Sequence, residues 1–261
     1  MKFRIVLFLS LIFLVVIFWI TLPSKKVKVI FCDVGQGDAT LVMYKNWQML
    51  IDAGPNNKKV LTCLERNIPF WDKRIEVFLI THGDSDHSGG ALDVFNYYEV
   101  VNFYSNGDLS KEIEQKYYSI KLNTFDVIKT NMINFDVVNS AQNYKNSMDS
   151  NEKSIAGILS YKDMKIFMSG DITIDVERRL VWQKILKDKV DILKVSHHGS
   201  KEATSDELLN VLSPKMAVIS VGLKNKFGHP TKEVLDRLKE KGIKIKRTDI
   251  NREVHVVDVI E

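Results

Sequence analysis

The sequence reads Val77-Phe78-Leu79-Ile80-Thr81-His82-Gly83-Asp84-Ser85-Asp86-His87 near the end of its first third. The apolar residues at 77–80 predict a strand that is buried on both faces. Glycine and serine then predict a tight turn, on which two imidazoles and two carboxylates fall within six residues. Such a dense group of carboxylates would repel itself unless a cation compensated it. The stretch therefore predicts a metal site at the end of a buried strand.

The spacing of these four side chains suits more than one metal. His82, Asp84, Asp86 and His87 occupy positions i, i+2, i+4 and i+5. On a turn they can divide into two sets, as in sites that hold two metals about 3.5–4 Å apart. Imidazole and carboxylate ligands favour zinc, manganese or iron over calcium. An ordinary Asp/Ser/Gly turn with two incidental histidines is the weaker interpretation.

Two further candidates follow predicted strands in the second half of the chain. Asp171 comes after the apolar residues 166–168, where it either bridges two metals or caps the helix expected from Thr173. His197 and His198 follow a strand at 190–195. Adjacent histidines cannot both be buried without partners, so one is expected to face the site and the other to support it or touch substrate. A solvated surface turn is the alternative.

The last candidate is His229, in Phe227-Gly228-His229-Pro230. A helix start with an incidental histidine is an equally good interpretation there. His255 alternates within a predicted strand and is expected to have no catalytic part. Five of the six histidines thus occupy loop positions, four of them beside other potential ligands, and this grouping favours a single assembled site.

The chain alternates predicted strands with amphipathic helices from Val27 onward. Strands are expected at 27–31, 40–44, 49–51, 75–80, 100–104, 125–128, 133–138, 155–160, 165–168, 192–195, 217–221, 243–246 and 254–259. Helices are expected at 60–67, 91–98, 109–118, 175–186, 206–212 and 232–241. Two sets of strands with helices outside them predict one domain, a sandwich of two sheets flanked by helices.

Composition narrows the possible functions and domain organisation only slightly. The 261 residues suffice for one large domain, or for a short anchor and a domain of about 230 residues. The net charge of +4 is compatible with a polyanionic substrate without requiring one. Cys32 and Cys63 lack CxxC spacing, so they indicate neither a thiolate zinc site nor a disulfide framework. Two small buried cysteines are expected, with a single disulfide as the alternative.

The N-terminus predicts a membrane segment. Residues 5–22 are apolar except for Ser10 and Thr21, and 18 residues of helix rise about 27 Å, close to the hydrocarbon thickness of a bilayer. No A-x-A cleavage pattern follows, so an uncleaved signal anchor at 1–24 is preferred over a cleaved signal peptide. Basic residues flank the segment on both sides and leave its orientation open. The remaining residues, 25–261, form the predicted domain.

Together these motifs carry a resemblance. His82-x-Asp84-x-Asp86-His87 resembles the metallo-β-lactamase superfamily motif, in the variant with aspartate in place of the second histidine. Four more segments are similar, in the same order, to the nuclease-like hydrolase domain of ComEC-type competence proteins: Asp33-Val34-Gly35-Gln36-Gly37-Asp38-Ala39, Ser169-Gly170-Asp171, Ser196-His197-His198-Gly199-Ser200 and Gly228-His229-Pro230. The similarity covers nearly all of residues 27–260. We see no counterpart of the family's polytopic channel, and so expect the hydrolase domain alone on one hydrophobic segment.

The resemblance implies an αβ/βα four-layer sandwich, the metallo-β-lactamase fold, with a two-metal site at the shared edge of its sheets. The implied ligands are His82, Asp84 and Asp171 for one metal, and Asp86, His87, Asp171 and His197, or alternatively His198, for the other. Superfamily hydrolases supply a further histidine before the Asp171 strand. Here Asn151 or Ser154 occupies that region, so the first site is expected to be more open. The stretch from Arg247 resembles a C-terminal strand pair, and a hairpin is expected there.

The expected chemistry is hydrolysis by a hydroxide that two divalent metals, zinc or manganese, generate from water. Asp86 or Asp84 would orient this nucleophile, and His198 or His229 would protonate the leaving group or hold a phosphate oxygen. The lysines at 201, 224 and 226 would contact a polyanionic backbone, although solvated surface lysines are the simpler interpretation.

The leading hypothesis is a phosphodiesterase, a DNase for DNA uptake in competence, at the outer face of a bacterial membrane or secreted if the N-terminus is cleaved. One alternative is a hydrolase of small esters, lactones, amides or cyclic nucleotides. Another is a catalytically silent module that binds nucleic acid or a partner, which the intact ligand set argues against.

Overall fold

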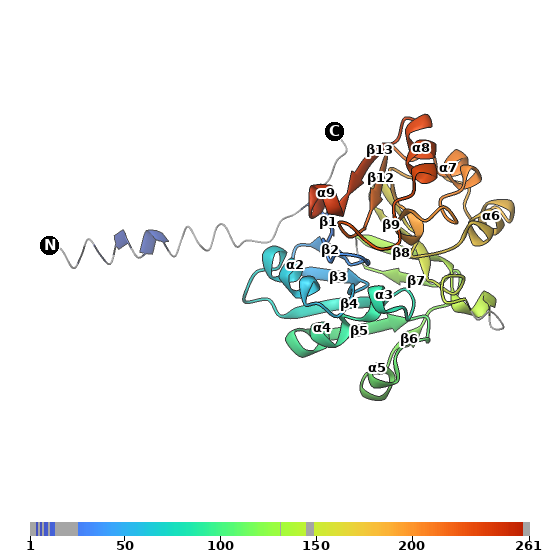
Figure 1. Cartoon of the computed structure of the whole chain (residues 1–261). Helices are drawn as coiled ribbons and strands as arrows, with labels where there is room; N and C mark the ends of the chain where they lie inside the picture. The colour runs from blue at the N-terminus through green and yellow to red at the C-terminus, as the bar shows by residue number, and fades with distance from the viewer. Residues whose placement is uncertain are drawn as a thin grey trace.

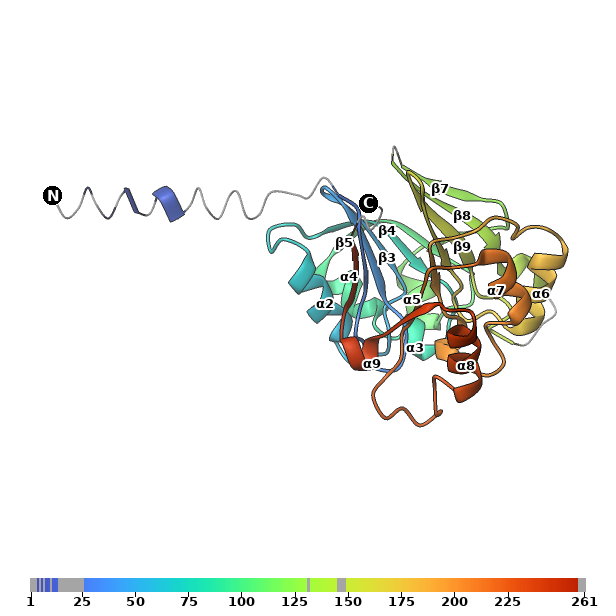
Figure 2. The same cartoon turned by 90° about the horizontal axis from the view of Figure 1, so that it is seen from above.

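Two seven-stranded sheets pack face to face in the computed structural model, with helices on their outer faces (Figures 1 and 2). The structure describes residues 26–130, 132–144 and 149–257, together with residues 4, 6, 8, 9 and 11–13. In spatial order the first sheet consists of β14 (Val254–Val257), β1 (Lys28–Phe31), β2 (Thr40–Tyr44), β3 (Trp47–Ile51), β4 (Arg74–Ile80), β5 (Glu99–Ser105) and β6 (Ile120–Lys121). The second consists of β13 (Lys244–Arg247), β12 (Met216–Ile219), β11 (Ile192–Lys194), β10 (Met164–Met168), β9 (Ala156–Tyr161), β8 (Ile133–Asn139) and β7 (Val127–Lys129).

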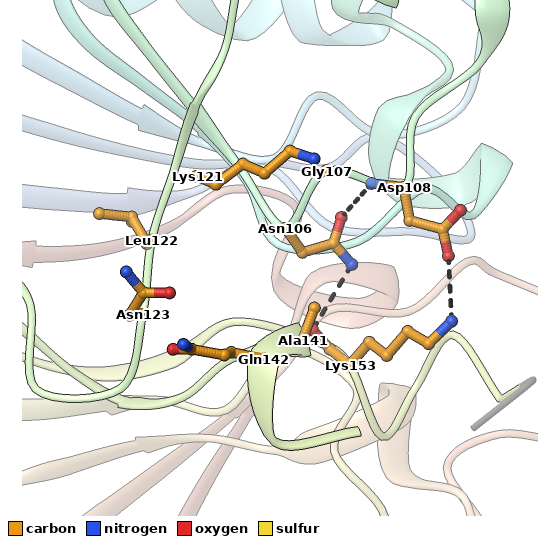
Figure 3. Close-up of a pocket in the computed structure, with 9 residues that line it drawn as sticks. All are labelled: Asn106, Gly107, Asp108, Lys121, Leu122, Asn123, Ala141, Gln142 and Lys153. Atoms are coloured by element: carbon orange, nitrogen blue, oxygen red, sulfur yellow. Dashed lines mark hydrogen bonds and ion pairs between the residues drawn. The ribbon is translucent and has the colours of Figure 1, made fainter. Parts of the chain in front are cut away.

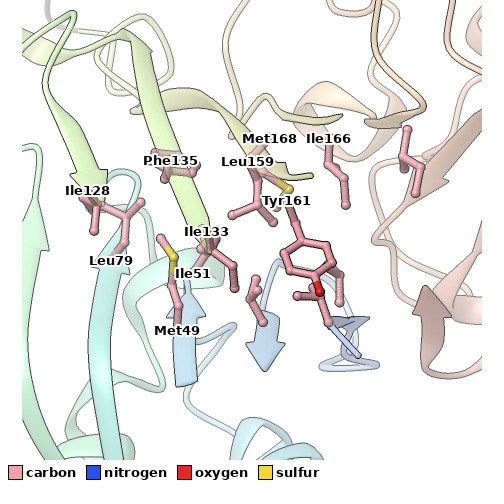
Figure 4. Packing of buried hydrophobic residues seen from close by; sticks show 14 of the residues in the cluster. Met49, Ile51, Leu79, Ile128, Ile133, Phe135, Leu159, Tyr161, Ile166 and Met168 are labelled. Carbon is pink, nitrogen blue, oxygen red and sulfur yellow. The ribbon is translucent and has the colours of Figure 1, made fainter. Parts of the chain in front are cut away.

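The space between the sheets is an apolar core. Alternate residues of one strand belong to different layers: Val29 and Phe31 face the second sheet, whereas Ile30 faces the helices. Figure 4 shows Met49 and other first-sheet residues packed against side chains from the second sheet. Strands buried on both faces need apolar residues at every position, which explains their continuous apolar runs.

Helices complete the outer layers. The first sheet is accompanied by α2 (Lys59–Asn67), α3 (Ser85–Ser88), α4 (Ala91–Tyr97) and α5 (Lys111–Lys116). The second is accompanied by η1 (Ala141–Tyr144), α6 (Ile174–Trp182), η2 (Ser196–Gly199), α7 (Asp206–Leu212) and α8 (Lys232–Glu240), and α9 (Thr248–Asn251) links the two sheets. Buried residues such as Leu64 and Val94 pack on the first sheet, and Leu180 and Leu208 on the second. The predicted two-sheet α/β sandwich is therefore confirmed.

Parallel pairing determines where the loops meet. β3, β4 and β5 run parallel in the first sheet, and β10, β11, β12 and β13 run parallel in the second. The carboxyl ends of parallel neighbours lie at the same edge of a sheet. The loops after β4, β10 and β11 carry the candidate ligands and therefore converge at one edge of the sandwich.

Several local predictions differ from the structure. The helix expected to reach residue 186 ends at Trp182, because Lys184 adopts a left-handed backbone and the Ile185 amide bonds back to the Leu180 carbonyl. The C-terminal hairpin is wrong: β13 pairs with β12 in the second sheet, whereas β14 pairs with β1 in the first. The intervening α9 carries the chain from one sheet to the other.

Both cysteines are buried as expected, but they are joined in the single disulfide that was the less favoured alternative. Cys32 follows β1 and Cys63 lies on the buried side of α2, and the two form a disulfide. Their Cα atoms are 5.9 Å apart, within the range that a disulfide spans. The bond ties the loop after β1 to the helix layer, a contact between residues 31 positions apart that spacing alone could not predict.

Among the described residues, no helix is both long and apolar enough to cross a bilayer. The membrane segment predicted at 5–22 lies mostly outside the described residues, so it stays a prediction.

Candidate metal centre

The His82–His87 turn is held by its own helical hydrogen bonds and by two neighbouring loops. Asp84 begins the short helix α3, and its carbonyl accepts hydrogen bonds from the amides of His87 and Ser88. The Asp38 amide donates to the Asp86 carbonyl (3.1 Å), and the Ala53 amide donates to the His87 carbonyl (2.7 Å). The loops after β1 and β3 therefore fix the backbone of the turn.

Two glycines allow these close approaches. A Cβ atom on Gly37, whose φ is +137°, would lie 2.2 Å from the Asp86 carbonyl oxygen. A Cβ atom on Gly83 would lie 1.8 Å from the carbonyl oxygen of Asp108, in the loop after β5. Both distances are far below van der Waals contact, so only glycine fits at either position.

His87 is oriented by a buried carboxylate. The parallel register sets Ile51 opposite Leu79 and so brings Asp52 beside Thr81. Asp52 accepts hydrogen bonds from the Thr81 amide (2.7 Å) and hydroxyl (2.8 Å), and its Oδ2 lies 2.8 Å from His87 Nδ1. With Nδ1 bound behind it, the ring directs Nε2 to within 3.3 Å of Asp171 Oδ2. This carboxylate–imidazole arrangement is how proteins prepare a histidine to bind a metal.

His198 is oriented by a backbone carbonyl. Its Nδ1 lies 2.9 Å from the Ser220 carbonyl oxygen, to which it can donate. Its Nε2 then faces Asp86 Oδ2 at 3.2 Å and Asp171 Oδ2 at 3.4 Å. Buried Glu177 anchors this turn by accepting hydrogen bonds from Ser196 Oγ and from the backbone amides of residues 204 and 205.

His82 follows the same pattern. Its Nδ1 lies 3.1 Å from Thr81 Oγ1 and 3.5 Å from Ser154 Oγ, while its Nε2 faces Asp84 Oδ2 at 3.6 Å. Ser154 therefore supports the ring from behind, and its hydroxyl also accepts from the Asp171 amide.

The converging atoms fit a divalent metal. Among the described residues, the Nε2 atoms of His82, His87 and His198 face carboxylate oxygens but are buried without a well-aligned hydrogen-bond partner. Ligand atoms of Asp38, His87, Asp171 and His198 all lie within 4.8 Å of one another. Donors at about 2.1 Å from a tetrahedral metal stand about 3.4 Å apart, close to the 3.2–3.4 Å that separates these nitrogens from the carboxylate oxygens. Buried imidazole nitrogens at this distance from carboxylate oxygens indicate that both sets of atoms are ligands for a cation.

The cluster also contains a buried lysine. The Lys194 ammonium contacts the Asp38 carboxylate, donates to the Gly170 carbonyl (3.0 Å) and lies 3.5 Å from Asp171 Oδ1. The carboxylates in or against the cluster are those of Asp38, Asp52, Asp84, Asp86 and Asp171. One ammonium group cannot balance five carboxylates, so the site favours additional positive charge.

The pKa shifts reflect the pairing of these carboxylates with the buried imidazoles. Burial disfavours the charge of Asp86, but the close polar contact with His198 Nε2 and the charges of His87 and His198 outweigh it and lower the pKa of Asp86 to about 2. Burial likewise opposes the charged form of His87, yet Asp171 and Asp52 raise its pKa well above the usual range. Without a metal the site retains protons, which a divalent cation would replace.

The remaining predicted residues surround the cluster. His197 is only half-buried, and its ring centroid lies 5.9 Å from that of His229. Burial and the nearby His198 and His197 lower the pKa of His229, and its buried Nδ1 has no hydrogen-bond partner among the residues that the structure describes. The side-chain oxygen of Asn151 is likewise buried and has no hydrogen-bond partner in the described part of the chain. The structure thus brings His198, and not His197, against Asp86 and Asp171.

The three lysines expected near the site lie on two different parts of the surface. Lys224 and Lys226 are exposed on the loop that carries His229. Lys201 is also exposed, but it lines a pocket that contains Asp149, Glu152, Asp175 and Glu202.

Three residues of the cluster were not predicted from the sequence. Asp38 ends one glycine-containing turn and Asp52 begins another, each beside a strand, and this position could have been recognised in the sequence. Lys194 lies inside an apolar strand and shows its role only through its contacts.

A pocket of about 530 Å³ opens beside the turn, on the side of Asp108. It is lined by Asn106, Gly107, Asp108, Lys121, Leu122, Asn123, Ala141, Gln142 and Lys153. Figure 3 shows Asn106 between the two lysines, of which Lys153 lies 3.8 Å from Asp108 Oδ2. Because Asp108 packs on Gly83, the pocket adjoins the His82 side of the centre.

Comparison with known proteins agrees with this geometry. A family model described as the Metallo-beta-lactamase superfamily matches residues 32–222. The chain is 27% identical to ComE operon protein 3 of Bacillus subtilis, over 87% of this chain and 32% of that protein. It is also 27% identical to Competence protein ComA of Neisseria gonorrhoeae, over 88% of this chain and 32% of that protein. Both relatives are ComEC-type competence proteins, and the chain spans about a third of their length.

Among solved structures, Igni18, a metallo hydrolase from the archaeon Ignicoccus hospitalis, has a TM-score of 0.57 and 17% identity, covering 88% of this chain and 98% of that one. This likeness is one of fold alone. Because the family model covers most of the sequence, the chain belongs to the metallo-beta-lactamase superfamily and is a hydrolase with that fold.

Proposed function

We propose that the protein is a metal-dependent phosphodiesterase that cleaves DNA. The observation that carries this proposal is the convergence of three anchored imidazoles on the carboxylates of Asp84, Asp86 and Asp171. A module that only binds a partner has no need of buried orphaned nitrogens in this arrangement.

Two divalent ions, zinc or manganese, are proposed to share the centre. His82, Asp84 and Asp171 would hold one, and Asp86, His87, Asp171 and His198 the other. We prefer His198 to His197 as a ligand because its Nε2 faces Asp86 and Asp171. Asn151 is the proposed additional ligand of the first metal, since its side-chain oxygen is buried and has no hydrogen-bond partner among the described residues.

When bound, the metals would supply an activated water and compensate the charge that develops at phosphorus. Asp86 and Asp84 are proposed to orient that water. His229 is proposed to hold a phosphate oxygen rather than to protonate the leaving group. Its lowered pKa keeps it neutral near neutral pH, so it can donate one hydrogen bond but has no spare proton to transfer.

DNA is the preferred substrate for two reasons. The pocket beside His82 carries Lys121 and Lys153, which suit the phosphates that flank a scissile bond. The relatives are competence proteins, although they are about three times longer than the aligned region.

The domain is proposed to act outside the cytoplasm. The Cys32–Cys63 disulfide favours an oxidising compartment, and the predicted membrane segment at 5–22 would hold the domain at the outer face of a bacterial membrane, or release it if cleaved.

The test is incubation of the purified full chain with linear DNA and with manganese or zinc. We expect DNA cleavage that a chelator abolishes. In parallel, a small phosphodiester, a carboxylic ester and a cyclic nucleotide are offered. Survival of the DNA together with cleavage of one of these small substrates would replace the DNA proposal by the small-molecule alternative. Absence of bound metal, with folding unchanged by chelator, would contradict both enzymatic hypotheses.

A further inference from the structure

An exposed aromatic ring stands beside the metal centre. Phe227 is 54% exposed, and its ring stacks on that of His229 with a centroid distance of 5.9 Å and an interplanar angle of 24°. The ring of His229 in turn lies 5.9 Å from that of His197, which lies 6.3 Å from that of His198. Phe227 is thus the outermost of a row of rings that leads from solvent to the buried cluster.

The loop that presents Phe227 is held firmly. The Asn225 side chain accepts hydrogen bonds from the amides of Phe227 (3.2 Å) and His229 (3.0 Å) and donates to the carbonyls of Gly222 (3.0 Å) and His229 (2.6 Å). The Gly222 amide donates to Gln36 Oε1, which ties the loop to the segment after β1. The exposed position of the ring is therefore built into the loop.

The surroundings of the ring are basic. Lys226 Nζ lies over the face of the Phe227 ring, 5.2 Å from its centroid, and this exposed side chain must swing aside for a base to stack there. Lys224 is exposed on the same loop. The other neighbour of the Phe227 ring is the half-buried ring of His229. A ligand that fits this loop has a flat apolar face with negative charge on either side of it, which describes a nucleotide of a nucleic-acid strand.

We propose that Phe227 is a stacking platform for an unpaired nucleobase of the DNA strand that the metal centre cleaves. This inference rests on the proposed function and adds that the substrate is single-stranded at that point, because only an unpaired base exposes its face. Lys224 and Lys226 would contact the flanking phosphates, and His229 the phosphate nearest the metals. Stacking is sequence-tolerant, so the loop would read the presence of a base and not its identity.

The test measures how tightly the metal-loaded full chain binds a fluorescent oligothymidylate of about 12 nucleotides. Its phosphorothioate linkages resist cleavage. A second ligand has the same backbone but abasic sugars. Phe227→Ala is expected to weaken oligothymidylate binding by about 5- to 100-fold and to leave abasic binding unchanged. Phe227→Trp, which keeps an aromatic ring at this position, should retain the preference for the ligand with bases.

The matched control is Phe70→Ala. Phe70 is 78% exposed and precedes β4, at the end of that strand opposite the centre, so its removal should change neither affinity. The proposal is overturned if Phe227→Ala binds both ligands as the unaltered protein does, or if the unaltered protein does not prefer oligothymidylate to its abasic analogue. In either case cleavage of ordinary DNA by the unaltered protein would leave the proposed function standing. Failure to cleave any DNA would remove the proposed function, and this inference with it.

Discussion

Replacing Asp52 by asparagine tests whether the metal centre depends on a carboxylate that does not itself face the metal. Asp52 is buried and accepts from the Thr81 amide and hydroxyl, and its other contact is His87 Nδ1 at 2.8 Å. Asparagine has the same shape and can still accept from the Thr81 amide. Its NH₂ group, however, would face His87 Nδ1 as a donor and favour the tautomer in which Nε2 carries the proton. That tautomer turns an N–H, and not a lone pair, toward Asp171.

The expected loss follows from this change of tautomer. Removing an outer partner of a metal-binding histidine costs about 10- to 100-fold in metal affinity, or about 1.4–2.7 kcal/mol. Isothermal titration of the metal-free protein with zinc or manganese measures it directly. Melting of the metal-free protein should also show a loss, about 1.5–3 kcal/mol, because the charge-assisted hydrogen bond between His87 and Asp52 is removed.

Asp191→Asn is the matched control. Asp191 also accepts from a backbone amide (Lys165, 3.0 Å) and pairs with a side chain (Lys215 Nζ, 2.9 Å), but it lies at the amino end of β11, away from the centre. The Asp191→Asn variant should be less stable than the unaltered protein but should bind metal as tightly. If Asp52→Asn binds metal as tightly as Asp191→Asn does, the carboxylate does not prepare His87 and the reasoning is refuted.

Three further outcomes are expected. His87→Ala should abolish hydrolysis and leave the domain folded by circular dichroism; full activity would remove His87 from the site. The free energy of unfolding of the metal-free protein should fall as the pH rises above about 6.5, because the raised pKa values of His87 and His198 mean that the folded state holds protons which the unfolded chain releases there. Metal-saturated protein should not show this loss in denaturant titrations across that pH range, and an equal loss with metal bound would contradict the assignment. Cys63→Ser should lower the free energy of unfolding by about 3–4 kcal/mol, the loop-closure value for a 31-residue separation, and dithiothreitol should reproduce the loss in the unaltered protein but not in the variant.

The elements of the fold were largely predictable because their signals are local. β2 at Thr40–Tyr44 and α7 at Asp206–Leu212 occur where the strand and helix patterns placed them. The end of α6 was not predictable, since the left-handed turn at Lys184 has no glycine to mark it. The separation of β13 and β14 into different sheets was missed because a short connection suggests a hairpin.

The sequence by itself determined the chemistry of the site. Apolar runs end at turns that carry imidazoles and carboxylates, and both the strand ends and the ligand types can be read from neighbouring residues. Tertiary structure alone decided which histidine faces the carboxylates, because His197 and His198 are adjacent and differ only in what surrounds them. It also decided that Lys194 contacts Asp38 and that Cys32 meets Cys63. These contacts join residues that are distant along the chain, and their formation depends on the packing of whole sheets and helices rather than on local sequence.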